Sequence, residues 1–308
     1  MEGYAQNIIN ETQIFAIVGR WGTGKTHFLA YFLKKLMDEG AKRNKRIAYS
    51  YLNPTPLDDE KLLVRTILEN LKPDEVREEF ADNLLRTSDL TLNNIVNVVN
   101  ELVKNDYIVY IMFDQLERAV ENAIQQGDRA SISKMGEIIS TLYRSVSSRV
   151  GANFALGIGS YEPSYVTLRG AREELSLLDQ RKIELSVLPR EAVKEFIKKY
   201  LETAELSETE LMDTLVNRHE VSRIIEARRQ NNLYPFTEEA IKAIHEVIRG
   251  ATTPRNVCNI AFRSLEMAAR LGAIKIGKEI IYKAHNPKYE VWYKEIEAGL
   301  SGLKLRQA

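Results

Sequence analysis

Short apolar runs alternate with longer stretches of helical spacing through the first two thirds of the chain. The runs expected to form strands are Gln13–Gly19, Arg46–Leu52, Tyr107–Phe113, Asn153–Gly159 and Lys182–Leu188. The third run is nearly all apolar, as expected for a central strand that is buried on both faces. This alternation is typical of a mostly parallel sheet wrapped by helices, so it predicts an α/β fold with about five strands.

Helices are expected to fill the gaps between these strands. Their approximate ranges are 25–39, 58–71, 91–105, 115–126, 129–147 and 189–203. Within Thr91–Val103, apolar residues recur at the spacing of one helix face. These residues are Leu92, Ile95, Val96, Val99 and Leu102. Pro189 lies where the helix after the fifth strand should begin, which is a favoured position for proline.

Strand-like patterns stop near residue 204, and the rest of the sequence has helical spacing. Further helices are expected over Leu206–Leu215, Glu220–Gln230, Thr237–Arg249, Pro254–Leu271 and Lys278–Ala284. Thr237 can cap one of them and Gly250 can end it. The sequence therefore predicts an α/β domain over residues 1–203 and an all-helical domain with a short C-terminal tail over residues 204–308.

A glycine-rich segment, Gly-Arg-Trp-Gly-Thr-Gly-Lys-Thr, matches the phosphate-binding pattern G-x-x-x-x-G-K-T. It lies directly after an expected strand and directly before an expected helix, which is the context that the motif requires. Its glycines let successive backbone N–H groups face phosphate oxygens, and the following helix adds the positive end of its dipole. The residues expected to bind nucleotide here are Gly19, Arg20, Trp21, Gly22, Thr23, Gly24, Lys25 and Thr26.

Three residues of this segment and the residue after it have individual expectations. Lys25 would contact the β- and γ-phosphates, and Thr26 would place its hydroxyl on Mg²⁺. The Trp21 ring could shield the phosphates, form part of a partner surface or pack on the second domain. His27, which follows the motif, is included among the nucleotide-binding residues, with a packing or surface role as its alternative. The motif therefore predicts ATP and Mg²⁺ as cofactors.

An acidic segment, Asp-Gln-Leu-Glu, follows the third expected strand. Asp114 is expected at the sheet edge beside the phosphate loop, where its carboxylate would hold Mg²⁺ together with Thr26; a helix-capping role is the alternative. Hydrolytic P-loop proteins usually carry a glutamate directly after this aspartate, but Gln115 stands there. Because an amide cannot accept the proton of the attacking water, slow hydrolysis with retained binding is expected. Glu117 is the nearest substitute for the missing catalytic glutamate.

The order of the motifs resembles the AAA+ ATPases, and among them the archaeal origin-recognition ATPases and related P-loop proteins of mobile elements and defence systems. The segments that carry the resemblance are Gly19–Thr26, Ile47–Asn53, Asp114–Glu117, Gly157–Ser160, Lys182–Pro189 and Gly250–Asn256. The first is highly specific, whereas the later ones gain force from their order. The resemblance implies a three-layer P-loop ATPase domain followed by a helical AAA+ lid.

The resemblance also implies roles for residues outside the phosphate loop. Ser160 falls where such families place a polar sensor between Asp114 and the γ-phosphate, with a strand-ending serine in a turn as the alternative. Arg255 matches the arginine that begins a lid helix and contacts the bound phosphates, a role that suits a guanidinium because it binds oxyanions bidentately. The segment from Tyr4 to Ile9 matches the position that cradles adenine.

An arginine finger, acting on the ATP of a neighbouring subunit, is a further implied feature. Arg181, just before the fifth expected strand, is the first candidate for it. Arg169 and Arg172 compete with it, and a surface charge is the alternative for all three.

The sequence departs from the origin-recognition pattern at its end. Those proteins usually continue into a winged-helix DNA-binding domain after the lid, and the residues that follow Ala284 are too few for one. The chain has 43 basic and 43 acidic residues, so no net charge draws it onto nucleic acid. DNA is therefore a possible partner that the charge does not favour. Self-association or a protein partner in the ATP state is expected.

The remaining composition excludes several classes of protein and site. A single cysteine, Cys258, excludes an internal disulfide and fits a reducing compartment. The sequence contains no apolar run long enough to span a bilayer and no signal-peptide pattern, so a cytoplasmic protein without a membrane partner is expected. The four histidines are scattered and lack metal-ligand spacing.

Two functions from different classes follow. The first is an AAA+ ATP-binding switch with slow hydrolysis that acts in DNA transactions such as replication, mobile-element maintenance or transposition. The alternative is a nucleotide-binding interaction protein of signalling or defence with little hydrolysis. A small-molecule kinase shares the phosphate loop but is disfavoured by the helical lid and by the lack of an evident acceptor site.

Overall fold

The computed structural model of the 308-residue chain describes residues 13–87, 89–150, 153–171, 173–176, 178, 181–203, 226–227 and 229–285. The chain divides into two compact units, Met1–Ser186 and Val187–Ala308. This division falls before the boundary expected near residue 203. The reason is that helix α11 (Arg190–Thr203) buries Val193 and Ile197 in the core of the second unit.

A six-stranded sheet forms the centre of the first unit. Its strands are β1 (Gln13–Gly19), β2 (Arg46–Leu52), β3 (Leu71–Lys72), β4 (Tyr107–Phe113), β5 (Phe154–Ser160) and β6 (Lys182–Leu185). Their spatial order is β3-β2-β4-β5-β1-β6, and every pair is parallel except β2 with β3. The expected mostly parallel sheet is confirmed. Strand β3 was not predicted because two residues are too few to show an alternating pattern.

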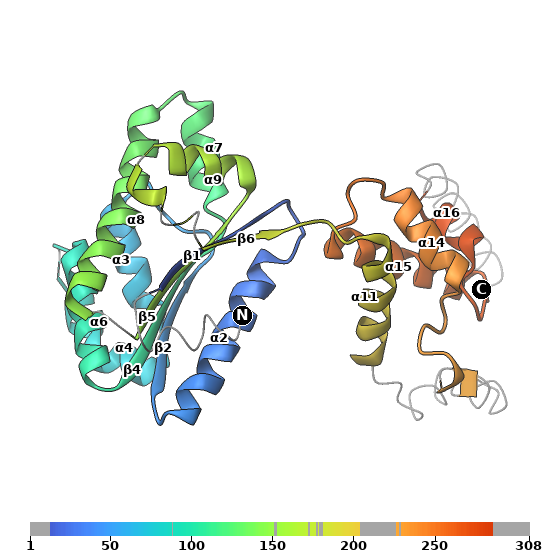
Figure 1. The fold of residues 1–308 in the computed structure, drawn as a ribbon, viewed down its shortest axis with the longest axis horizontal. Coiled ribbons are helices and arrows are strands. Elements are labelled where there is room, and N and C mark those ends of the chain that lie inside the picture. Colours follow the sequence, from blue (N-terminus) through green and yellow to red (C-terminus); the bar gives the residue numbers. More distant parts are fainter. Residues whose placement is uncertain are drawn as a thin grey trace, which may run out of the picture. The chain divides into compact units, whose positions relative to one another are not determined.

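Helices cover both faces of this sheet (Figure 1). On one face lies α2 (Lys25–Lys42), whose Phe32 packs edge-on against Phe15 of β1 and Tyr110 of β4, with ring centroids 4.6 and 5.3 Å apart. On the other face lie α3 (Glu60–Glu69), α6 (Leu92–Lys104) and α8 (Arg129–Val150). The first unit is therefore the expected three-layer α/β/α sandwich.

Shorter helices complete the first unit. They are α4 (Asp74–Phe80), α5 (Asp82–Leu85), α7 (Glu117–Gln125), α9 (Glu162–Gly170) and the 3-10 turn η1 (Glu173–Ser176). Helices α7 and α9 follow the carboxyl ends of β4 and β5, and they pack against each other and against α8. They therefore begin at the same edge of the sheet as the phosphate loop.

The described part of the second unit is helical apart from one short parallel bridge between Phe236 and Ile276. Besides α11 it contains α14 (Glu238–Val247), α15 (Pro254–Arg270) and α16 (Lys278–His285), which pack around a common apolar core. Thr237 caps α14 as expected, its hydroxyl accepting a hydrogen bond from Ala240 N at 3.2 Å. The prediction of a helical second unit is confirmed.

Two of the expected helices of the second unit, 206–215 and 220–230, lie outside the described residues, apart from residues 226–227 and 229–230 of the second. Among the helices that are described, none is both long enough and apolar enough to cross a membrane.

Candidate functional site

The phosphate loop connects β1 to α2. Its backbone turns through Gly22 and Gly24, whose φ angles are 79° and 97°, a left-handed conformation that costs other residues free energy. A β-carbon at Gly19 would lie 2.6 Å from the carbonyl oxygen of Leu185, so that position has no room for a side chain. The glycines of the motif are therefore required by the shape of the loop itself.

Lys25 is folded back onto this loop and is only 7% exposed. Its Nζ donates hydrogen bonds to the carbonyl oxygens of Gly19 at 3.0 Å and Arg20 at 3.3 Å. It also lies 5.7 Å from the centre of the Trp21 ring. Because a hydrogen bond between two ionised groups is stronger than one to a neutral carbonyl, a phosphate oxygen would be a better acceptor for this ammonium.

Thr26, in the first turn of α2, contacts Asp114 after the end of β4. Its Oγ1 donates to Asp114 Oδ2 at 2.6 Å. Asp114 is fully buried, and its Oδ1 accepts a hydrogen bond from Gln115 N at 2.9 Å. A hydroxyl has one proton and two lone pairs, so Thr26 can donate to Asp114 and still offer a lone pair to a metal. The structure thus brings together the two residues expected to hold Mg²⁺.

This contact spans a strand, because β5 lies between β4 and β1. Gly159 of β5 leaves the necessary space, because a β-carbon there would lie 2.6 Å from Asp114 Oδ1. Gly157 of the same strand leaves space for Tyr110 instead, since a β-carbon there would lie 2.6 Å from the Tyr110 hydroxyl. Both glycines belong to Gly157–Ser160, a segment that contributes to the family resemblance only through its place in the order of the motifs. Their regular alternation along a strand was the signal that could have revealed their function.

The donor set fits magnesium. Mg²⁺ prefers hard oxygen ligands and is usually bound through one or two carboxylates together with substrate phosphates, not by an all-protein cage. Thr26 and Asp114 supply a hydroxyl and a carboxylate oxygen within hydrogen-bonding distance of each other. Across the described residues, no group of three or more His, Cys, Asp or Glu side chains could hold a metal ion. A metal would therefore be bound jointly by the protein and a nucleotide.

The structure adds Tyr51 of β2 to the site. Its hydroxyl donates to Asp114 Oδ2 at 2.9 Å, so this oxygen accepts from both Tyr51 and Thr26. The amide Nδ2 of Asn53 in turn donates to the Tyr51 hydroxyl at 2.8 Å. Both residues belong to Ile47–Asn53, a segment that contributes to the family resemblance, but no motif predicts a function for either side chain.

Gln115 adopts a left-handed backbone conformation, with φ at 55°. Such a conformation costs a residue with a β-carbon about 1 kcal/mol. Its side-chain Oε1 is buried and accepts no hydrogen bond. Helix α7 begins only at Glu117, two residues after its expected start at 115, because the chain must first turn through Gln115. Gln115, directly after Asp114 in the sequence, therefore combines a strained backbone with an unpaired polar atom.

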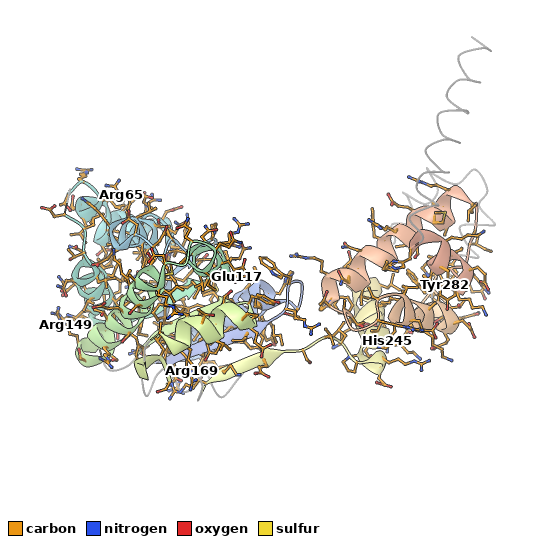
Figure 2. The ribbon with its side chains drawn as sticks, turned by 90° about the horizontal axis from the view of Figure 1, so that it is seen from above. Arg65, Glu117, Arg149, Arg169, His245 and Tyr282 are labelled. Atoms are coloured by element: carbon orange, nitrogen blue, oxygen red, sulfur yellow. The ribbon has the colours of Figure 1, made fainter. Side chains whose placement is uncertain are left out.

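Glu117 lies at the first position of α7 (Figure 2) and is 1% exposed. Its Oε2 accepts a hydrogen bond from Tyr161 N at 3.2 Å, whereas its Oε1 is buried without a hydrogen-bond partner. Burial raises the pKa of this carboxyl; the charge of Lys25 opposes the shift and that of Asp114 adds to it. Glu117 therefore ties the start of α7 to the start of α9 and resists ionisation.

Ser160 ends β5 and is buried. Its hydroxyl donates to the carbonyl oxygen of Tyr161 at 3.2 Å, which corresponds to the turn role that the sequence left as an alternative to the sensor. The Tyr161 ring lies 6.5 Å from the Trp21 ring, at 37° to it. Trp21 remains 47% exposed. Two aromatic rings thus flank the loop beside Lys25.

The remaining residues expected in or near the loop take simpler positions. Thr23 is buried and donates to the Arg20 carbonyl oxygen at 2.8 Å, which stabilises the turn of the loop. Arg20 and His27 are exposed. Arg181, the first arginine-finger candidate, donates a hydrogen bond to the side chain of Gln13 within its own chain.

The other arginine candidates lie apart from the loop in sequence. Arg169 is exposed near the carboxyl end of α9 (Figure 2). Arg255 is the second residue of α15 in the second unit and is exposed. Arg172 and the segment from Tyr4 to Ile9 lie outside the described residues.

Comparison with protein families matches residues 4–81 to the KAP family P-loop domain. The matched range contains the phosphate loop and Tyr51 but ends before Asp114. None of the curated proteins matches the chain.

Several solved structures share the fold. The ORC2 protein of Aeropyrum pernix, in ADPNP-ADP complexes, is 15% identical with a TM-score of 0.61, and the match covers 92% of this chain and 65% of that one. Its ADP form is 16% identical with a TM-score of 0.57, covering 92% and 66%. The ORC1 protein of the same organism, in complex with DNA, is 12% identical with a TM-score of 0.53, covering 88% and 58%.

These likenesses concern the fold, since all the identities are low. The chain spans less than two thirds of the length of the structures that it matches. Within that span it has the fold of these structures, a mostly parallel sheet with a phosphate loop followed by a helical region. The resemblance to archaeal origin-recognition ATPases, expected from the order of the motifs, is confirmed at the level of fold.

Proposed function

We propose that this protein is an Mg²⁺-dependent, ATP-binding switch that hydrolyses ATP slowly. The observation that carries the proposal is the 2.6 Å hydrogen bond between Thr26 Oγ1 and Asp114 Oδ2, for which Gly159 of β5 leaves the space. It places a hydroxyl and a carboxylate beside a loop of backbone N–H groups and a buried ammonium. That combination suits a nucleotide triphosphate and its metal ion.

Each part of the loop would have a distinct task. The backbone N–H groups and the amino-terminal end of α2 would bind phosphate oxygens. Lys25 would exchange two carbonyl acceptors for phosphate oxygens, which neutralises part of their charge. Bound Mg²⁺ neutralises the rest of the negative charge of the phosphates. Thr26 and Asp114 are the residues that would hold this ion.

Slow hydrolysis is expected because neither Gln115 nor Glu117, the two residues that could orient the attacking water, is a good general base. The amide of Gln115 cannot accept a proton. Glu117 could, but burial raises its pKa and one of its oxygens is engaged by Tyr161 N. A general base must be ionised and within reach of the water that it activates. We therefore assign the residual hydrolytic activity to Glu117 and expect it to be weak.

The biological role that we propose lies in DNA transactions such as replication, mobile-element maintenance or transposition. Its support is the likeness in fold to the ORC proteins of Aeropyrum pernix, one of which is described in complex with DNA. In this role ATP binding would favour one conformation and with it self-association or a protein partner, as expected of a population shift. Arg255 is the residue of the second unit that we propose as a phosphate ligand.

A second function, a nucleotide-binding interaction protein without useful hydrolysis, is favoured by the same two observations at Gln115 and Glu117. ATP hydrolysis by the wild type and by Glu117→Gln, with and without DNA, separates the two functions. The switch predicts slow turnover that Glu117→Gln abolishes. Activity at background level in both proteins favours the interaction protein. Turnover far above about one per second, typical of active enzymes, contradicts the slow switch.

Molecular size in solution tests the proposed conformational switch. The protein is sized with ADP and with a non-hydrolysable ATP analogue, each with and without DNA. A shift in apparent mass between the two nucleotides supports nucleotide-controlled association. Lys25→Ala is the control, because it removes the buried ammonium and should make the mass independent of nucleotide.

A further inference from the structure

We propose that Tyr51 is a positioning residue for the magnesium site, and that Asn53 sets the direction of its hydrogen bond. The proposal rests on the proposed function, because it concerns the same carboxylate. It assigns a function to the side chain of Tyr51, in β2, and to that of Asn53, directly after this strand.

The sheet places Tyr51 next to the strand that leads to Asp114. Strands β2 and β4 are parallel neighbours, with Tyr51 opposite Met112. Two hydrogen bonds hold the backbone of Asp114 to the end of β2 and the residues after it: Asp114 N donates to Leu52 O at 3.0 Å, and the side-chain hydroxyl of Thr55 donates to Asp114 O at 3.1 Å. The Tyr51 side chain therefore meets a fixed backbone at Asp114, and its hydroxyl can control only the orientation of the carboxylate.

Three donors fix that orientation. Asp114 Oδ1 accepts from Gln115 N, whereas Oδ2 accepts from both Thr26 Oγ1 and the Tyr51 hydroxyl. Burying a carboxylate costs free energy unless its oxygens accept hydrogen bonds, which these donors supply. Because Tyr51 and Thr26 donate to the same oxygen, Tyr51 keeps Oδ2 beside Thr26 when the hydroxyl of Thr26 also binds a metal.

Asn53 gives this bond its direction. A phenol has one proton, which it can donate to a single acceptor. Because Asn53 Nδ2 donates to the Tyr51 oxygen at 2.8 Å, the phenolic proton is left for Asp114. The series runs from amide to phenol to carboxylate, and hydrogen bonds aligned in one direction strengthen one another.

The test is calorimetric titration with a non-hydrolysable ATP analogue, in excess Mg²⁺ and in excess chelator. The gain in affinity due to Mg²⁺ is the measured quantity. For Tyr51→Phe we expect this gain to fall about tenfold, as for the loss of one hydrogen bond to a charged group, with no change in the affinity measured in chelator. For Asn53→Ala, an exposed position, we expect a smaller fall of about two- to threefold.

Tyr49→Phe is the matched control. Tyr49 lies two residues earlier on β2 and points to the same face of the sheet, since side chains alternate along a strand. Its substitution should leave the gain due to Mg²⁺ unchanged. Thermal unfolding of all variants checks that they fold, and Asn53→Ala keeps the test open should Tyr51→Phe fail to fold.

The outcomes separate this inference from the proposed function. If the wild type gains nucleotide affinity from Mg²⁺ and Tyr51→Phe gains as much or more, the positioning role of Tyr51 is overturned, whereas the proposed function stands. The positioning role is also overturned if the nucleotide affinity of Tyr51→Phe falls equally in chelator and in Mg²⁺, because the residue would then act on the fold of the loop. A wild type without any gain from Mg²⁺ overturns the proposed function and this inference together.

Discussion

The carboxylate of Asp114 passes directly over Gly159, where a β-carbon would lie 2.6 Å from Asp114 Oδ1. The same β-carbon would lie 3.1 Å from Leu29 Cδ1, so the side chain of Leu29 in α2 also limits this space. Gly159 belongs to β5, the strand that separates Asp114 from the phosphate loop. The metal site that we propose therefore depends on a strand position without a side chain.

Gly159→Ala should displace the Asp114 carboxylate and break its bond to Thr26. We expect loss of most of the gain in nucleotide affinity due to Mg²⁺. Overpacking of the core should also lower the free energy of unfolding by about 1–3 kcal/mol. Calorimetric titration with and without Mg²⁺, together with urea unfolding, measures the two effects.

The control for this variant is Gly170→Ala. Gly170 ends α9, and a β-carbon there would meet no atom within 4 Å. Since alanine is the better helix former, its stability should equal or exceed that of the wild type. If Gly159→Ala keeps the full Mg²⁺ effect, the carboxylate does not depend on this gap in β5.

Gln115→Glu should accelerate ATP hydrolysis. The substitution places a carboxylate directly after Asp114, where hydrolytic P-loop proteins usually carry one. General-base catalysis contributes about 100-fold or more, so at least a tenfold rise in turnover is expected even with imperfect geometry. A steady-state phosphate-release assay measures it.

Gln115→Ala is the control for this prediction, because it removes the amide without adding a base and should stay as slow as the wild type. A variant Gln115→Glu that is no faster than Gln115→Ala would show that residue 115 does not limit hydrolysis.

Glu117→Gln should stabilise the protein at neutral pH. Burial raises the pKa of Glu117 above its ordinary value of 4.5 in the folded state, so between the two values the folded chain binds more protons than the unfolded chain. Wild-type stability from this group is therefore fully present below pH 4.5 and declines as the pH rises through the folded pKa. The glutamine variant does not titrate and should escape this decline.

Urea unfolding at about pH 4 and about pH 7.5 checks the prediction, since the stability difference between variant and wild type should grow with pH. Glu121→Gln, which removes a charge at a partly exposed position of the same helix, is the control. A difference that shrinks as the pH rises would mean that Glu117 is stabilised in its ionised form.

Arg255→Ala tests the ligand that rests on the family resemblance. If its guanidinium binds the phosphates of ATP, the affinity for the ATP analogue should fall about tenfold or more, as for the loss of a charge-assisted hydrogen bond. Arg263→Ala, on the same helix, should have little effect. Equal affinities of both variants and the wild type would remove Arg255 from the proposed site.

Much of the fold could be predicted from the sequence because its signals are local. The apolar run of β4 and the loop at Gly19–Thr26 carry enough pattern to locate a buried strand and a phosphate loop without the rest of the chain. The order of the motifs then indicated a three-layer domain followed by a helical one. The division at Ser186 could not be read in this way, because the helical pattern of α11 is the same whichever core it packs against.

Residues of the site could be predicted only where a sequence motif assigns a residue type a single usual function. Lys25, Thr26 and Asp114 were identified by their motifs, and the structure brings Thr26 and Asp114 into contact. The engagement of Tyr51 with Asp114 depends on the register of two strands far apart in the sequence, which no local pattern contains.

The same limit applies to Glu117. Its role as a base was proposed from its distance in sequence to Asp114, whereas its hydrogen bond to Tyr161 N follows from the packing of α7 against α9.

The most direct test of the central claim is the affinity of the protein for a non-hydrolysable ATP analogue with and without Mg²⁺, in the wild type and in Asp114→Asn. The claim is that Lys25, Thr26 and Asp114 jointly bind a nucleotide and its metal ion. It predicts measurable binding by the wild type that tightens with Mg²⁺, and an Asp114→Asn variant that still binds but no longer responds to Mg²⁺. Absence of nucleotide binding in the wild type, or an equal response to Mg²⁺ in both proteins, would contradict it.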